Sequence, residues 1–267
     1  MYEIVRVIFT TRFLAGVFRL TTPIVFASMS CLIAKKAGVR NITIEGTMLC
    51  SALTGVIVSA FTQNVWLGLA AGTIAGVGIG LFLGYFHILM DTDIWLTGIA
   101  INQFANGFTV FVMFLVTGDK GSTSVLPSLT VPNIEIPLLK DIPLVGSVVS
   151  GQCLFTYLAV ILIVFIYILL YKTPLGLRIR AVGEYSLAAE SVGESPHRIK
   201  LIALSLSGLC ASFGGMFMSM SYSSRFVRDM VAGRGFIGIA AESMGGGRPV
   251  AAAAASQLFG GTPAQIE

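Results

Sequence analysis

The sequence predicts an all-α protein, a polytopic transmembrane helical bundle with about seven membrane segments, some short or broken. Of its 267 residues, 55% are hydrophobic and only 11% are charged, whereas about 25% are charged in an average soluble domain. The apolar stretches are long enough to cross about 30 Å of hydrocarbon as helices. Ten-residue segments of alternating hydrophobicity, typical of membrane β-barrels, are absent from the sequence. The bilayer is therefore the solvent that fits this composition.

Four apolar segments are clear, and three are shorter or interrupted. The clear ones are 64–88, 94–117, 152–172 and 199–221; the others are 14–34, 44–61 and 235–260. Two hydrophilic insertions, 118–151 and 173–198, separate them, and we interpret residues 1–267 as a single transmembrane domain. The first insertion contains four prolines, which favour extended or turn structure over helix.

Basic residues orient the chain. Insertion 173–198 and its flanks are basic, so the positive-inside rule places this insertion in the cytoplasm. Insertion 118–151 has nearly balanced charges, which makes it an external loop. The single segment 152–172 joins the two, so the assignments agree. The same count puts the N-terminus outside despite its arginines, which leaves open an interfacial helix at residues 4–18.

One apolar segment carries a glycine at every fourth position. Such a stripe lets the backbone of a neighbouring helix approach closely, which matters in lipid because no hydrophobic force drives helices together there. We predict that segment 64–88 packs tightly within a bundle. The glycines are Gly68, Gly72, Gly76, Gly80 and Gly84.

Polar side chains inside apolar segments are costly in a membrane, so each one is a candidate for function. Asn102, Gln103 and Asn106 cluster in segment 94–117, where Asn102 and Asn106 share one helical face. Their amides serve either a solute pathway or hydrogen bonds between helices. The phenylalanines of the same segment favour core or lipid contact over stacking with a solute.

Two glycine-flanked breaks contain acidic residues. Glu45 either anchors the N-terminus of a half-helix or faces the pathway. Glu242 and Arg248 flank the glycines at 245–247, where pairing between them would hold a re-entrant turn.

The sequence contains no enzyme signature. It has no HExxH, Walker A or GxSxG pattern and only two histidines, and its four cysteines lie in or beside apolar stretches without a CxxC spacing. We therefore predict a non-catalytic membrane protein with no catalytic residue, metal site or cofactor.

The basic insertion 173–198 is long for a chain that exposes so little to water. Within it, EYSLAAESVG predicts a short helix that ends near Gly193. The segment is either an ordinary solvated loop or a helix that fits a cleft on an ATPase, whose rigid-body motion would then move the flanking helices.

Several stretches carry a family resemblance. They are VRNITIEGTML (39–49), DTDIWLTGIAINQFANG (91–107), the segment 173–215 with GLRIRAVGE, and the segment 232–261 with AGRGFI. In this order they resemble the permease family of ATP-binding cassette importers for ribose, branched-chain amino acids and nucleosides. The likeness is closest to the nucleoside branch, which works with a lipid-anchored binding protein of the basic-membrane type.

The resemblance implies a function and partners. It implies a multi-pass permease of the bacterial cytoplasmic membrane that imports a nucleoside or similar small polar solute by alternating access. ATPase subunits would hydrolyse ATP, an extracytoplasmic binding lipoprotein would deliver the solute, and a second permease, identical or different, would complete the path. The family-like residues of the ATPase-coupling segment are Arg178, Arg180, Gly183, Glu184, Ala188, Ala189 and Gly193.

The sequence departs from the resembling permeases at two places. It has NITIEG where they carry NIGLEG, which leaves the local backbone conformation open, and it stops at GGTPAQIE where they usually continue through a further membrane segment. A short member, a fragment and a chain completed by a neighbour all fit this ending. Alternative functions are import of a simple sugar or branched-chain amino acid by the same class, a secondary transporter or channel without an ATPase, and a non-transporting assembly subunit.

Overall fold

The structure is a computed structural model that describes residues 11–126, 128–132 and 151–261. Within these ranges the ordered elements are helices, and an isolated β-bridge joins Ser122 to Val227. Part of the predicted external loop, residues 133–150, lies outside the described residues. Helices cross apolar surroundings because they satisfy their own backbone hydrogen bonds, so the predicted all-α bundle is confirmed.

Six helical segments of the described chain are long and apolar enough to span a membrane. They are α2 (Thr11–Lys36), α3 (Ile44–Thr62), α4 (Val65–Gly84) with the π-helical turn η1 (Tyr85–Leu89), α5 (Ile94–Thr117), α7 (Leu154–Lys172) and α10 (Pro196–Phe217) with the π-helical turn η2 (Met218–Tyr222). The expected seventh segment, 235–260, is broken. It consists of α11 (Arg234–Met244) and α12 (Pro249–Gly261), two helices each too short to cross.

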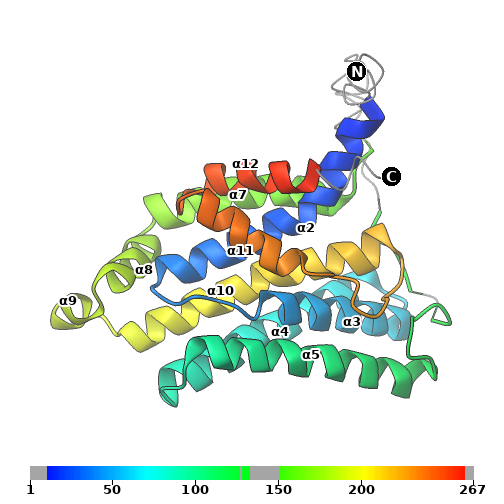
Figure 1. The fold of residues 1–267 in the computed structure, drawn as a ribbon, viewed down its shortest axis with the longest axis horizontal. Coiled ribbons are helices and arrows are strands. Elements are labelled where there is room, and N and C mark those ends of the chain that lie inside the picture. The colour runs from blue at the N-terminus through cyan, green and yellow to red at the C-terminus, as the bar shows by residue number, and fades with distance from the viewer. Residues whose placement is uncertain (1–10, 127, 133–150, 262–267) are drawn as a thin grey trace.

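Helices α2, α3 and α10 form the buried centre of the bundle, whereas α4, α5 and α7 lie further out and expose more of their surface (Figure 1). The core includes Phe26, Met48 and Phe217, one from each central helix. The phenylalanines of α5 lie on its exposed side and not in the core; of the two expected positions, this is the one that permits contact with lipid. They are Phe104, Phe108, Phe111 and Phe114.

The glycine stripe of α4 packs against the two central helices α3 and α10. All five glycines are buried. A Cβ on Gly68 would meet the backbone oxygen of Gly55 in α3, and a Cβ on Gly80 would meet that of Leu204 in α10. The stripe thus brings the backbone of α4 into direct contact with its neighbours, which side chains at these positions would prevent.

We expect Gly76→Val to destabilise the bundle by about 2 kcal/mol, because overpacking a tight contact forces neighbours to shift. A Cβ at this position would lie 2.5 Å from Ser212 Cβ and 2.8 Å from the Gly208 oxygen. Gly78→Val is the matched control, since a Cβ there meets nothing within 4 Å. Thermal unfolding in detergent measures both variants. Equal loss of stability in the two would show that valine in α4, not close packing, is responsible.

The two insertions lie at opposite ends of the bundle (Figure 1). The first packs its described part on η2 and on the connection from η2 to α11. Thr123 N donates to the Phe226 oxygen of that connection at 2.9 Å, and Val131 N donates to the Met220 oxygen of η2 at 2.9 Å. The second forms α8 (Pro174–Glu184) and α9 (Ser186–Ser191), beside the end of α2. We call these the loop end and the α8–α9 end of the bundle.

Candidate functional site

Two helices, α3 and α11, begin inside the bundle rather than at one of its ends (Figure 1). The connection from α2 turns back into the bundle, where Asn41 donates from Nδ2 to the Ser207 hydroxyl at 2.8 Å, halfway along α10. The side-chain oxygen of Asn41 accepts from both the backbone N–H and the hydroxyl of Thr43. Thr43 has φ −76°, so the glycine of the resembling permeases is not needed at this position.

Glu45 joins the N-termini of these two half-helices. It lies in the first turn of α3, and its Oε1 accepts from Gly233 N at 2.7 Å while its Oε2 accepts from Gly235 N at 2.8 Å, at the start of α11. A carboxylate at a helix N-terminus satisfies free N–H groups and complements the helix dipole. A Cβ on Gly235 would lie 2.6 Å from Glu45 Oε2, so glycine admits this approach. These are the contacts that an anchor requires.

Asn102 of α5 braces the same region. Its Oδ1 accepts from Gly46 N at 2.9 Å, and its Nδ2 donates to the Ile42 oxygen at 2.8 Å. Both halves of the amide are thereby used on backbone groups around the start of α3. Gln103 is exposed and Asn106 half-buried, and within the described chain neither side chain makes a hydrogen bond. The structure therefore separates the three polar residues that the sequence grouped.

We expect Asn102→Leu to lower stability by about 1–3 kcal/mol, because it removes the partners of a backbone N–H and a carbonyl within the bundle. Gln103→Leu, one residue further on, changes an exposed side chain and should leave stability within about 0.5 kcal/mol. Thermal unfolding and uptake should be measured on both variants. An Asn102→Leu protein of normal stability that fails in uptake would assign Asn102 to the pathway rather than to bracing.

A cavity of about 410 Å³ lies between α2, α5, α11 and the connection at 40–42. Trp95 and Phe236 contribute aromatic rings to its wall, and the other polar or charged groups are Lys35, Arg40, Asn41, Glu242 and Ser243. The Arg40 guanidinium lies 5.7 Å from the centre of the Trp95 ring. This combination of aromatic rings and a few converging polar groups is typical of small-molecule sites.

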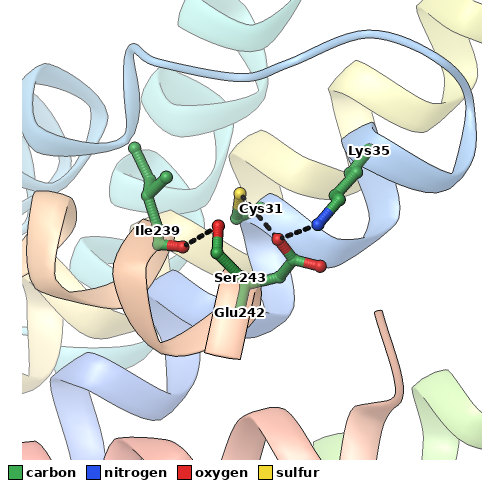
Figure 2. A network of polar contacts seen from close by, with 5 residues as sticks. All are labelled: Cys31, Lys35, Ile239, Glu242 and Ser243. Carbon is green, nitrogen blue, oxygen red and sulfur yellow. Dashed lines mark hydrogen bonds and ion pairs between the residues drawn. The ribbon is translucent and has the colours of Figure 1, made fainter. Parts of the chain in front are cut away.

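One ion pair stands in the wall of this cavity (Figure 2). Lys35 Nζ of α2 lies 2.9 Å from Glu242 Oε2 of α11, and the Cys31 thiol lies 4.0 Å from the same oxygen. The side chain of Glu242 is only 1% exposed, and its Oε1 accepts no hydrogen bond from the described part of the chain. The expected pairing of Glu242 with Arg248 was wrong, because the turn after α11 leaves Arg248 exposed while Glu242 points to α2.

The α8–α9 end presents a second candidate site. A Cβ on Gly183 would meet the backbone of Lys36 and Gly38, so α8 packs directly on the end of α2. Arg178 pairs with Glu194 at 2.8 Å, and the Arg180 guanidinium lies 5.1 Å from the Tyr171 ring centre. Gly193, with φ +88°, follows the end of α9, and its N–H donates to the backbone carbonyl oxygen of Glu190 at 2.9 Å.

This end also exposes large apolar side chains. Leu187 is 66% exposed and Val192 is 78% exposed, while Glu184 and Ala188 are exposed beside them and Ala189 is buried. Exposed apolar groups on a segment that leaves the membrane helices are typical of a protein–protein interface. The predicted coupling residues thus lie at one end of the bundle. Some of them, such as Gly183 and Ala189, pack against the rest of the chain, whereas others, such as Glu184 and Ala188, are exposed.

Sequence reasoning missed most residues of the cavity. Lys35, Arg40 and Trp95 were not among the candidate site residues predicted from the sequence. Lys35 and Glu242 are 207 positions apart, so no local pattern reveals their pairing. The available signal was an ionisable residue near the end of each of two apolar segments, since intramembrane charges pair with one another.

Known proteins match nearly the whole chain. Residues 13–264 match the family model described as the branched-chain amino acid transport system / permease component. The guanosine ABC transporter permease NupQ of Bacillus subtilis is 32% identical over 245 residues, covering 89% of this chain and 76% of that protein. No solved structure matches the chain significantly.

Two further relatives differ in what their names say they carry. A putative glucose ABC transporter permease of Haloferax volcanii is 30% identical, with 93% of this chain and 76% of that protein covered. The nucleoside ABC transporter permease NupC of Lactococcus lactis is 28% identical, with 90% and 77% covered. The family match, these relatives and the six apolar helices lead to one conclusion: the chain is a multi-pass membrane protein that belongs to the branched-chain amino acid transport system permease family of ABC transporters.

Proposed function

We propose that this chain is the permease subunit through which an ABC importer admits a nucleoside, with energy delivered at the α8–α9 end by a partner ATPase. The assignment of a nucleoside as the transported solute rests on the likeness to permeases named for guanosine and nucleosides, over about nine-tenths of the chain. A binding protein outside and a second permease subunit complete the proposed importer. The α8–α9 end faces the cytoplasm in this proposal, as its basic residues favour.

The cavity between α2, α5 and α11 is the proposed solute-binding site of this chain. Its volume of about 410 Å³ falls in the range of small-molecule pockets. The rings of Trp95 and Phe236 offer apolar faces of the kind on which bases stack. Arg40 offers donors to a neutral polar solute, and the Ser243 hydroxyl, which donates to the Ile239 oxygen, offers an acceptor. A cavity with both kinds of group suits a nucleoside.

The Lys35–Glu242 pair forms the side of this cavity nearest the α8–α9 end, because Lys35 is one residue from the end of α2. We infer that the pair separates when the solute passes. Replacing Glu242 alone by methionine leaves Lys35 unpaired and should cost about 1–2 kcal/mol, since Lys35 still reaches water.

The double variant Lys35→Met/Glu242→Met should regain stability, because it leaves no charge unpaired at this half-buried pair. If the pair serves passage, uptake stays low in the double variant although its thermal unfolding returns to normal. Recovery of uptake together with stability would reduce the pair to a structural role.

Competition by unlabelled solutes for uptake tests which solute the importer carries. Membrane vesicles that contain the chain with its ATPase, binding protein and sister permease should take up radiolabelled guanosine when ATP is present. Unlabelled nucleosides should suppress this uptake, while glucose, ribose and leucine should not. Uptake of glucose instead, with nucleosides inactive, would move the cargo to the sugar class that the Haloferax relative is named for.

A further inference from the structure

A second cavity, of about 340 Å³, lies at the α8–α9 end and shares only Lys35 with the lining of the first cavity. Its wall is mostly polar and comes from the ends of α2 and α7, from α8, and from the turn between α11 and α12. Three cations line it: Lys35, Lys36 and Arg180. Since α2 and α7 end at Lys36 and Lys172, the cavity lies at the level where membrane helices meet the polar headgroups.

The charge at this cavity is only partly balanced. Glu242 holds Lys35, and Glu184 is the carboxylate that lines the cavity itself. Lys36 and Arg180 make no ion pair within the described chain. The buried Nε of Arg180 also lacks a hydrogen-bond partner there, although stacking on Tyr171 fixes its guanidinium. A buried donor of this kind is uncommon unless a ligand satisfies it.

The turn after α11 leaves room beside these cations. Gly246 and Gly247 both have positive φ, +58° and +72°, a conformation that glycine adopts at low cost. Both glycines line the cavity, and a Cβ on Gly247 would lie 3.1 Å from Lys36 Nζ. The lysine ammonium thus sits directly over a turn without side chains.

We propose that this cavity binds a phosphate group, presented by the headgroup of an anionic lipid. A planar guanidinium and an ammonium are the usual partners of phosphate oxygens. Basic pockets between membrane helices at the cytoplasmic side take up lipid phosphates, and the cavity lies at that depth. A soluble phosphate ester shares this chemistry, so the test separates the two sources.

The test uses the purified transporter complex in neutral detergent and measures binding by native mass spectrometry. Short-chain phosphatidylglycerol, short-chain phosphatidylcholine and glycerol phosphate are titrated separately. Phosphatidylglycerol should bind saturably and more tightly than the other two. Lys36→Gln should weaken its binding about fivefold, the effect of about 1 kcal/mol per basic residue, whereas Lys36→Arg should retain it.

Lys172→Gln is the matched control. It removes the same charge from the same end of the bundle, but Lys172 does not line the cavity. Equal weakening by Lys36→Gln and Lys172→Gln would overturn the proposal in favour of diffuse attraction. Equal binding of the two lipids would overturn it by showing no preference for an anionic headgroup. Tighter binding of glycerol phosphate than of phosphatidylglycerol, lost in Lys36→Gln, would uphold a phosphate site and refute the lipid as its source.

Discussion

Glu45→Ala is expected to lower the free energy of unfolding more than any of the other single substitutions proposed above. The alanine leaves Gly233 N and Gly235 N without an acceptor at the start of α11. Hydrogen bonds to a charged group contribute about 1.5–3 kcal/mol each, so the loss should reach about 3 kcal/mol or more. Glu45 is buried, with 8% of its surface exposed, and water therefore replaces these bonds poorly.

Thermal unfolding of the purified protein measures the effect. Glu190→Ala is the control, because it removes an exposed carboxylate and should change stability by less than about 0.5 kcal/mol. Glu45→Gln should fall between, since its amide keeps one oxygen acceptor but turns a donor towards another N–H. A Glu45→Ala protein as stable as the wild type, but inactive in uptake, would place Glu45 in the pathway instead.

Gly193→Pro is expected to abolish association with the ATPase while leaving the membrane bundle intact. Gly193 has φ +88°, which proline cannot adopt because its ring fixes φ near −65°. Proline also removes the N–H that donates to the backbone carbonyl oxygen of Glu190. The end of α9 must therefore change course, and its exposed Leu187 and Val192 move with it. We expect affinity for the ATPase to fall at least about tenfold, or 1.4 kcal/mol.

Co-purification of the ATPase with tagged permease measures this association. Gly193→Asn is the matched control, since asparagine tolerates the left-handed conformation and should keep both the turn and the partner. Outside its chain neighbours, nothing in the described chain lies within 4 Å of a Cβ at this position, so the asparagine side chain has room. Normal recovery of the ATPase with Gly193→Pro would refute the coupling role of α8 and α9.

Local sequence patterns predicted much of the fold. The glycine at every fourth residue of 64–88 is a property of a single segment. The helix around EYSLAAES was predictable for the same reason, because its ending at Gly193 follows from backbone conformation. The helical bundle and the position of α9 were accordingly expected before any contact was known.

Contacts between distant segments were not predictable in this way. The motif around Glu45 indicated a break and an anchor, but its partners at Gly233 and Gly235 lie nearly 190 positions away. Asn102 was grouped with Gln103 by proximity in sequence, whereas the structure commits it to the start of α3. The cavity needs three helices and a connection to come together, so no segment alone carries its pattern.

The central claim, that this chain admits solute only when a partner ATPase drives it, is tested most directly by guanosine uptake into vesicles with and without ATP. Vesicles with the complete complex should accumulate guanosine only when ATP, the ATPase and the binding protein are all present, and Gly193→Pro should abolish the uptake. Guanosine entry through this chain without the ATPase would contradict the account and indicate a self-sufficient channel or secondary transporter.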